Sequence, residues 1–325
     1  MRDALPKRAF IWVTGVIDRR IGWYRLPEPL ALPVLTGIRM KLRRTNLIDP
    51  EATPVAWGPE ELPDGPRPEV RTITGRFDNL ARPGEGSAGE IFGRNAALAV
   101  DVPQNVVDPN PRVISNELLA RREFIPATSL NLVAAAWLQF EVHDWMSHGP
   151  NPTDDQFEIE LDPADLWPHG RPMLVERTER AADTTDGGVP SYRNTETHWW
   201  DASQVYGSTQ VVEDMLRIDP DGVKIPGGKL RLTADDLLPF NPARFPLGHD
   251  VNLAAVTGNW WVGLAMMHTL FMREHNLICD RLAAVYPEMT GDELYDHARL
   301  INAAQIAKIH TVEWTPALLT NPTLH

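Results

Sequence analysis

The sequence is poor in cysteine, because Cys279 is the only one among 325 residues. A single cysteine allows no internal disulfide and excludes metal sites built from several thiolates. It also favours a reducing compartment, so we expect a cytoplasmic protein. Basic charge is scarce as well: 44 acidic residues outnumber 31 basic ones, and the formal net charge is −13. That balance argues against a nucleic-acid partner, which needs a clustered positive field.

Long apolar runs are missing at the N-terminus. The N-terminal stretch is MRDALPKRAFIWVTGVIDRR. Its apolar run is too short, and its charges are too many, for a signal peptide or a membrane-spanning helix. Residues 26–44 do join an apolar segment, LPEPLALPVLTG, to the basic tail IRMKLRR. This segment could lie on a membrane surface. Packing against the rest of the chain is the alternative, because prolines interrupt long amphipathic helices.

Apolar residues make up 43% of the chain, which is enough for a well-buried core. We expect a mainly α-helical protein in two parts. Residues 1–115 hold turn-forming stretches such as PEELPDGPRPEV and predict an irregular N-terminal arm that packs on the core. Residues 116–325 predict a helical domain, with long helices over about 129–147, about 258–285 and from Thr290 onward.

Smaller elements are predicted between these helices. A short helix is expected in NPRVISNELLARREF with Ser115 as its N-cap, a strand in DQFEIELDP, and a helix in STQVVEDMLRI. Thr290 followed three residues later by Glu293 has the spacing of a capping box, which marks the start of the last long helix.

Residues 137–149, WLQFEVHDWMSHG, place polar groups inside an aromatic helix. Residues four apart share a helix face, whereas neighbours point about 100° apart. Gln139 and His143 therefore project together, and Asp144 points to the side of Phe140. A histidine that only packs in the core is the alternative for His143. A buried carboxylate at Asp144 needs a charge, a metal ion or several donors, unless it is exposed near the helix end.

A second polar cluster is THWWDASQVYGS, residues 197–208. Thr197, Asp201 and Ser203 supply side-chain oxygens, and the backbone carbonyl of Trp199 lies between them. Hard oxygen ligands with two carboxylates, counting Asp144, suit Ca²⁺ better than Zn²⁺. The alternative is a capping loop in which Asp201 or Ser203 caps the helix that follows.

Together these stretches make the chain similar to the animal-type haem peroxidase and cyclooxygenase superfamily, and within it to the fatty-acid α-dioxygenases. The stretches that carry the resemblance are NLVAAAWLQFEVHDW, THWWDASQVYGS, MREHNLICD, ARLINAAQIAKIHTVEWTPALL, GRFDNLARPGEGSAGEIFGRN and ELLARREFIPA. The resemblance implies a haem-peroxidase-like helical core and a b-type haem.

The resemblance also implies roles for single residues. His143 would be the distal haem histidine, with Gln139 lining the same pocket. One Ca²⁺ would be held by Asp144, Thr197, Trp199 through its carbonyl, Asp201 and Ser203. His249 in PLGHD resembles the place where α-dioxygenases keep a histidine near the substrate carboxylate, and a histidine on a surface loop is the alternative.

The activity that the resemblance implies is oxygenation of fatty acids, or of another small molecule, with O₂ or peroxide. A neutral imidazole above haem iron can take a proton from peroxide and return it to the leaving oxygen. In α-dioxygenases a tyrosyl radical removes hydrogen from the α-carbon of a fatty acid, and O₂ then adds. The chain is therefore expected to be a haem-dependent oxidoreductase.

Two departures from the family pattern bear on that expectation. The superfamily's distal arginine is missing: the corresponding stretch AAVTGNWWVG has Thr257 and Gly258 there, and Arg273 belongs to the REHN segment instead. Without this arginine no fixed cation supports the charge that develops when the O–O bond breaks.

The second departure concerns the family's proximal haem histidine and catalytic tyrosine, which lie downstream of LLTNPTLH. His268, His275 and His310 do not match the proximal motif and are expected to be helix-packing residues. We expect a chain that is truncated before the proximal ligand and requires the missing C-terminal half. The alternative is a catalytically inactive remnant that keeps the fold and the calcium site.

Overall fold

The computed structural model describes residues 5–46, 70–80, 82–92, 107–127, 130–149, 151, 154–181, 191–240 and 251–319. The chain divides into two compact units, and each is described by itself. Unit 1 comprises residues 1–56, 93–100 and 308–325, and unit 2 comprises residues 57–92 and 101–307. Among the described residues, no helix is long and apolar enough to cross a membrane.

Unit 1 contains a helical hairpin. Helix α1 (Leu5–Ile21) and helix α2 (Glu28–Asn46) pack against each other and are joined through a 3₁₀ turn, η1 (Trp23–Arg25). The helices come close at Gly37, where a Cβ atom would collide with the Thr14 side chain. A small residue is therefore needed at this crossing point.

This hairpin corrects the prediction of an irregular chain in residues 1–115. Pro33 lies inside α2 and does not end it. Proline removes one backbone hydrogen bond from a helix interior, but Ala31 and Val34 on either side of Pro33 are buried. Burial of this face in the hairpin offsets the lost hydrogen bond, and a sequence pattern alone does not contain that information.

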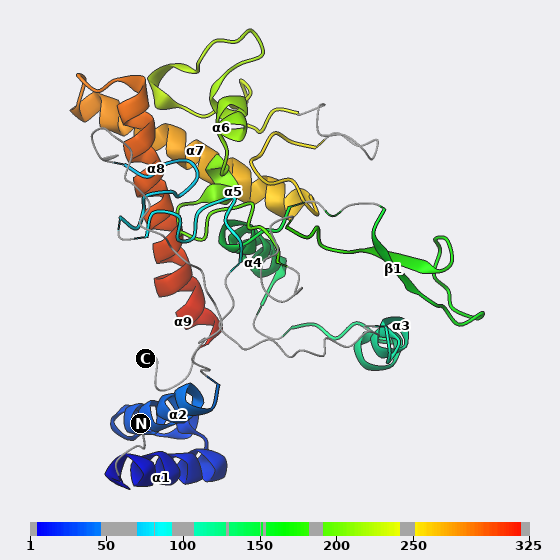
Figure 1. Cartoon of the computed structure of the whole chain (residues 1–325). Coiled ribbons are helices and arrows are strands. Elements are labelled where there is room, and N and C mark those ends of the chain that lie inside the picture. The colour runs from blue at the N-terminus through cyan, green and yellow to red at the C-terminus, as the bar shows by residue number, and fades with distance from the viewer. Residues whose placement is uncertain are drawn as a thin grey trace. The chain divides into compact units, whose positions relative to one another are not determined.

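Unit 2 is built around three helices (Figure 1): α4 (Leu132–Trp145), α7 (Val262–Val285) and α8 (Gly291–Lys308). Helix α4 packs against α7 through aromatic side chains. Phe140 stacks on Phe271 with ring centroids 5.3 Å apart. A cluster of Ile278, Cys279 and Ala298 packs α7 against α8.

The helix ends follow local sequence signals. Thr290 Oγ1 accepts a hydrogen bond from Glu293 N, and Glu293 Oε2 accepts one from Thr290 N, so the predicted capping box is confirmed. Helix α4 begins after Asn131, whose side chain accepts from Ala134 N. Past Lys308 the chain continues through a π-helical turn, η5 (Ile309–Trp314), into α9 (Thr315–Leu318).

The prediction of Ser115 as an N-cap is wrong. The short helix α3 (Pro111–Ile114) is capped by Asn110, whose side chain accepts from Arg112 N and Val113 N. Ser115 instead begins the π-helical turn η2 (Ser115–Leu119). The Asn-Pro pair before Arg112 supplies both the cap and a preset first turn, and these outcompete the serine.

The remaining elements of unit 2 are short. The predicted strand is β1 (Gln156–Ile159), and it pairs antiparallel with β2 (Met173–Glu176), which the sequence analysis did not predict. Helix α6 (Gln210–Arg217) matches the predicted STQVVEDMLRI helix and is followed by a 3₁₀ turn, η3 (Pro226–Gly228).

Residues 70–80 and 82–92 form turns that pack on the loop around residues 194–199. His198 N donates to Gly86 O over 2.8 Å, and Gly89 N donates to Asn194 O over 2.7 Å. Gly75 has a φ of +72°, and a Cβ atom there would lie 2.9 Å from the Trp199 ring. These turns cover the second polar cluster.

Candidate functional site

The structure places Gln139 and His143 on one face of α4, and Gln139 is tied to the segment that precedes α7. Its Oε1 atom accepts a hydrogen bond from Trp261 Nε1 over 2.8 Å, and its Nε2 atom donates to Asn259 O over 3.2 Å. Both the oxygen and the nitrogen of the side-chain amide are used, so the orientation of Gln139 is fixed.

His143 is half-buried, and burial lowers its pKa below the ordinary value for histidine. The imidazole is therefore neutral at pH 7. Its Nδ1 atom is buried and has no hydrogen-bond partner among the described residues. A neutral ring with a free nitrogen is able to exchange a proton with a bound molecule.

His268 on α7 belongs to the same region, although the sequence analysis gave it only a packing role. It is fully buried, with the rings of Phe140 and Trp260 each 5.1 Å away between centroids. Neither ring nitrogen has a hydrogen-bond partner in the described chain. Burial is the main cause, with the neighbouring His143 as a second one, and the pKa of His268 falls to about 3. No sequence signal distinguished this residue, because its surroundings come from α4 and from the segment before α7.

Asp144, the neighbour of His143, lies on the other face of α4 and is buried. Its Oδ1 atom accepts hydrogen bonds from Ser203 N over 2.6 Å and from Ser203 Oγ over 3.0 Å. Asp144 thus holds the start of α5 (Ser203–Tyr206) from a distant part of the sequence. The different partners of His143 and Asp144 agree with the helix-face argument.

The capping-loop alternative for residues 197–203 does not describe the structure. The residue before α5 is Ala202, which has a φ of +61°, and no side chain of this loop caps the helix. The Asp201 carboxylate has other partners. Its Oδ1 atom accepts a hydrogen bond from Thr197 Oγ1 over 2.5 Å, and its Oδ2 atom forms an ion pair with Arg299 Nη2 at 3.0 Å. The Trp199 carbonyl accepts a hydrogen bond from the Asp201 amide.

All four side chains predicted to bind Ca²⁺ are buried, and they converge. Asp144, Thr197, Asp201 and Ser203 are each exposed by at most 1%. Burial, and next the charge of Asp201, raises the pKa of Asp144 to about 8. Burial also raises the pKa of Asp201, although the Arg299 guanidinium opposes this effect.

Two charged residues missed by the sequence analysis complete this electrostatic cluster. Asp78 interacts with Asp201, and burial raises its pKa to about 6 against the opposing effect of Arg71. Arg71 Nε lies 3.8 Å from Asp78 Oδ2. Three carboxylates thus share the field of two guanidinium groups, Arg71 and Arg299, and this excess of negative charge favours a cation.

The donor set is compatible with Ca²⁺, because it consists of carboxylate, hydroxyl and carbonyl oxygens. In the part of the chain that the structure describes, no group of three or more His, Cys, Asp or Glu side chains could hold a metal ion. A site here would therefore depend on the neutral oxygens of Thr197, Trp199 and Ser203 as well as on Asp144 and Asp201.

The other histidines separate clearly from His143. His275 Nδ1 lies 2.9 Å from Tyr206 Oη, and its Nε2 atom lies 3.0 Å from Gly228 O. Both nitrogens of His275 are used within the protein, so it is a structural residue. His249 lies outside the described residues. At the position of the missing distal arginine, Gly258 has open space where a Cβ atom would extend.

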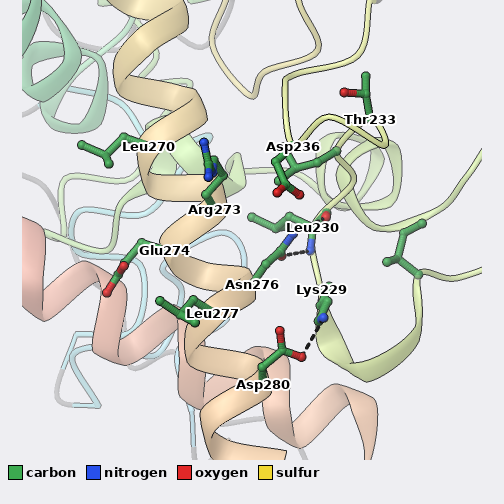
Figure 2. A pocket seen from close by; sticks show the side chains of 12 residues that line it. Lys229, Leu230, Thr233, Asp236, Leu270, Arg273, Glu274, Asn276, Leu277 and Asp280 are labelled. Atoms are coloured by element: carbon green, nitrogen blue, oxygen red, sulfur yellow. Dashed lines mark hydrogen bonds and ion pairs between the residues drawn. The ribbon is translucent and has the colours of Figure 1, made fainter.

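A pocket of about 720 Å³ lies beside α7, between this helix and residues 225–236 (Figure 2). Asn276 bridges to the backbone of Leu230, and Lys229 Nζ forms an ion pair with Asp280 Oδ1 at 2.6 Å. None of the predicted site residues lines this pocket. The candidate haem-facing residues lie elsewhere, on α4 and on the N-terminal half of α7.

These features define the class of protein. The model of the animal haem peroxidase family matches residues 70–324, and the chain belongs to this family. The resemblance inferred from the sequence is therefore confirmed.

Among curated proteins the chain is similar to α-dioxygenases of plants. It is 35% identical to α-dioxygenase 1 of Capsicum annuum over 326 residues, which cover 98% of this chain and 47% of that protein. It is also 35% identical to the α-dioxygenase PIOX of Nicotiana tabacum over 329 residues, covering 99% of this chain and 48% of that protein. The chain thus spans about half the length of the curated relatives it matches.

Solved structures of α-dioxygenases are also similar to this chain. A crystal structure of the Oryza sativa fatty acid α-dioxygenase matches with a TM-score of 0.81 and 30% identity, covering 99% of this chain and 50% of that one. A second structure of that enzyme, a variant with palmitic acid, matches with a TM-score of 0.80 and 29% identity, again covering 99% of this chain and 50% of that one. The expected mainly α-helical, haem-peroxidase-like fold is confirmed.

Proposed function

We propose that this protein is a haem-dependent oxidoreductase that oxygenates fatty acids, in the manner of the α-dioxygenases it is similar to. The observation that carries the proposal is the division of labour on α4. The neutral His143, beside a fixed Gln139, faces one side, and Asp144 joins the 197–203 loop on the other.

A b-type haem bound against this face of α4 would supply the redox chemistry that amino-acid side chains lack. His143 would accept a proton from a peroxide or oxygen species at a ring nitrogen and release it again, since burial keeps the imidazole neutral. Gln139 would line the same pocket, and its two hydrogen bonds to Trp261 and Asn259 keep it in place.

We propose that Asp144, Thr197, Trp199, Asp201 and Ser203 hold one Ca²⁺. The ion would neutralise two buried carboxylates whose pKa values are raised by burial. Its role would be structural, because it would fix α4, and therefore His143, to the loop that leads into α5.

The proposed substrate is a fatty acid, with O₂ or peroxide as co-substrate. His249 in PLGHD is the candidate for contact with the substrate carboxylate. We further propose a cytoplasmic protein in peripheral contact with the membrane, since fatty acids partition into bilayers. The part of the α-dioxygenase relatives that this chain does not cover would supply the proximal ligand and the catalytic tyrosine.

Haem binding tests the first proposal. Two proteins are reconstituted with haemin: the 325-residue chain, and a version extended to the length of its relatives. Each should give a Soret band, and His143→Ala should shift that band. His297→Ala is a matched control, because His297 is exposed on α8. Palmitate-dependent O₂ uptake should follow haem binding. An extended protein that takes up no haem would refute the proposal in favour of the inactive remnant, which the missing distal arginine otherwise supports.

Calcium binding is tested separately by calorimetric titration. Asp144→Asn should weaken Ca²⁺ binding at least 100-fold, whereas Asp280→Asn, which alters an exposed ion pair with Lys229, should leave it unchanged. Equal Ca²⁺ affinity of both variants would contradict the assignment.

A further inference from the structure

The charge of the chain is strongly segregated. Residues 5–46, which form the α1–α2 hairpin, contain nine Lys and Arg residues but only two acidic ones, Asp18 and Glu28, a net charge of +7. Arg2 and Asp3 cancel, so residues 47–325 carry −20 of the total −13. A local positive element in an acidic chain points to an anionic partner of the hairpin.

The hairpin also exposes large apolar side chains. Its interior is filled by Ile11, Ala31 and Val34. Leu5 is 83% exposed and Trp12 is 68% exposed. Further exposed apolar residues on the two helices and their turn are Phe10, Val13, Ile21, Tyr24, Leu30, Leu32, Leu35 and Leu42. An apolar surface of this kind next to basic residues is unfavourable in water and marks an interaction site.

One face of α1 combines both properties in a groove of about 620 Å³. Leu5, Trp12 and Gly15 line its apolar part at helical spacing, and Arg8, Arg19 and Lys41 are the cations of its lining. Long basic side chains extend their aliphatic stems over apolar surface while their charges reach polar surroundings. The groove therefore suits a partner that presents anionic groups directly above an apolar layer.

We propose that the α1–α2 hairpin is a membrane-docking element that lies in the interface of a bilayer containing anionic phospholipids. Trp12 and Leu5 enter the boundary between headgroups and acyl chains, and Arg8, Arg19 and Lys41 contact the phosphate groups. A nucleic acid would neutralise the same cations but would leave the exposed Trp12 and Leu5 without an apolar partner. In this arrangement both helices lie parallel to the membrane surface.

This proposal specifies the peripheral membrane contact named above but does not depend on haem or on catalysis. Binding to anionic vesicles is a demanding test, because a protein of net charge −13 should be repelled by them unless a local element binds. The whole chain is sedimented with vesicles of pure phosphatidylcholine and with vesicles that contain 30% phosphatidylserine.

We expect binding to the phosphatidylserine vesicles and at least tenfold weaker binding to pure phosphatidylcholine, with a strong decrease at high salt. The variant Arg8→Glu/Arg19→Glu/Lys41→Glu should bind about 100-fold more weakly, because each basic residue near an anionic surface contributes roughly fivefold. Its matched control, Arg122→Glu/Arg180→Glu/Arg281→Glu, makes the same change of charge at exposed positions outside the hairpin.

The apolar contribution is tested by Leu5→Ser/Trp12→Ser, which should weaken binding at least tenfold. Leu166→Ser/Val223→Ser is its control, because these two exposed residues lie outside the hairpin. Circular dichroism establishes that each variant keeps its helices. Vesicle binding that the hairpin and control variants lose equally, or no vesicle binding by the unaltered chain, would overturn the proposal. Binding of duplex RNA in place of vesicles would do the same.

Discussion

Two histidines of α7, His268 and His275, lie two turns apart on the same helix and are both fully buried. Burial lowers the pKa of both, to about 3 and about 4 respectively. Their surroundings differ: His275 uses both ring nitrogens in hydrogen bonds to Tyr206 and Gly228, whereas neither nitrogen of His268 has a partner in the described chain.

The difference shows that burial and a depressed pKa do not by themselves mark a functional residue. His275 belongs to a hydrogen-bond network in which Asn302 Nδ2 also donates to Tyr206 Oη over 2.9 Å. A network of this kind holds α5, α7 and α8 together. His268 faces the same region as His143, and ring nitrogens of both residues have no hydrogen-bond partner among the described residues. The number of hydrogen bonds made within the protein therefore separates structural groups from candidate functional ones.

The largest effect is expected at a buried ion pair, that of Asp201 and Arg299. Arg299→Leu removes the cation from a buried ion pair with a 3.0 Å contact and leaves Asp201 charged and buried. We expect a loss of about 4 kcal/mol in the free energy of unfolding, measured by urea denaturation. A loss below about 1 kcal/mol would show that this ion pair is not important for the stability of the fold.

His275→Phe should come next. It removes two buried hydrogen bonds of the imidazole, one to the Tyr206 hydroxyl and one to the Gly228 carbonyl, and the expected loss is about 3 kcal/mol. Urea denaturation of Tyr206→Phe gives a consistency check, because this change removes the hydrogen bonds of the hydroxyl to His275 and Asn302 but keeps the aromatic ring, and it should cost less.

The pH dependence of stability gives a further test of the two histidines. Both histidines have a folded-state pKa below the ordinary 6.5, so the unfolded chain takes up protons that the folded chain does not. Stability should fall as the pH decreases through 6.5, by about 2 kcal/mol for each histidine between pH 7 and pH 5. Glu141, whose pKa burial raises to about 8, acts in the opposite direction.

The test therefore compares the pH dependence of the unfolding free energy of the unaltered chain with that of His268→Phe. Between pH 7 and pH 5, the free energy of unfolding of His268→Phe should fall by about 2 kcal/mol less than that of the unaltered chain. Thermal or urea unfolding at both pH values measures this difference. An identical pH dependence of the two proteins would contradict the depressed pKa of His268.

The smallest effect is expected for His268→Phe at pH 7. The ring lies against Phe140 and Trp260, and no hydrogen bond to a described residue is lost. The free energy of unfolding should change by about 1 kcal/mol or less. A loss as large as that of His275→Phe would mean that His268 is structural after all.

The sequence predicted what depends on local spacing. The separation of Gln139 and His143 from Asp144 follows from helix geometry, and the capping box of Thr290 and Glu293 follows from side-chain chemistry. Features that depend on tertiary packing were not predictable. Pro33 is accepted in α2 because that helix packs on α1.

The distinction between the two histidines of α7 belongs to the same class. It depends on Tyr206 and Gly228, which lie 69 and 47 residues from His275 in the sequence. The partner of Asp201, Arg299, is 98 residues away, and nothing in the local pattern around either residue indicated the pair.

The contact between Asp144 and Ser203 closes a loop of 59 residues. A covalent cross-link over a loop of that size would lower the entropy of the unfolded chain and so raise its free energy by on the order of 4 kcal/mol. With Cys279 as its only cysteine, this protein cannot make such a cross-link. A calcium ion bound by Asp144 and the 197–203 loop would be a reversible cross-link in its place. This cross-link would form or break with the free Ca²⁺ concentration, and reductants that break a disulfide would not affect it.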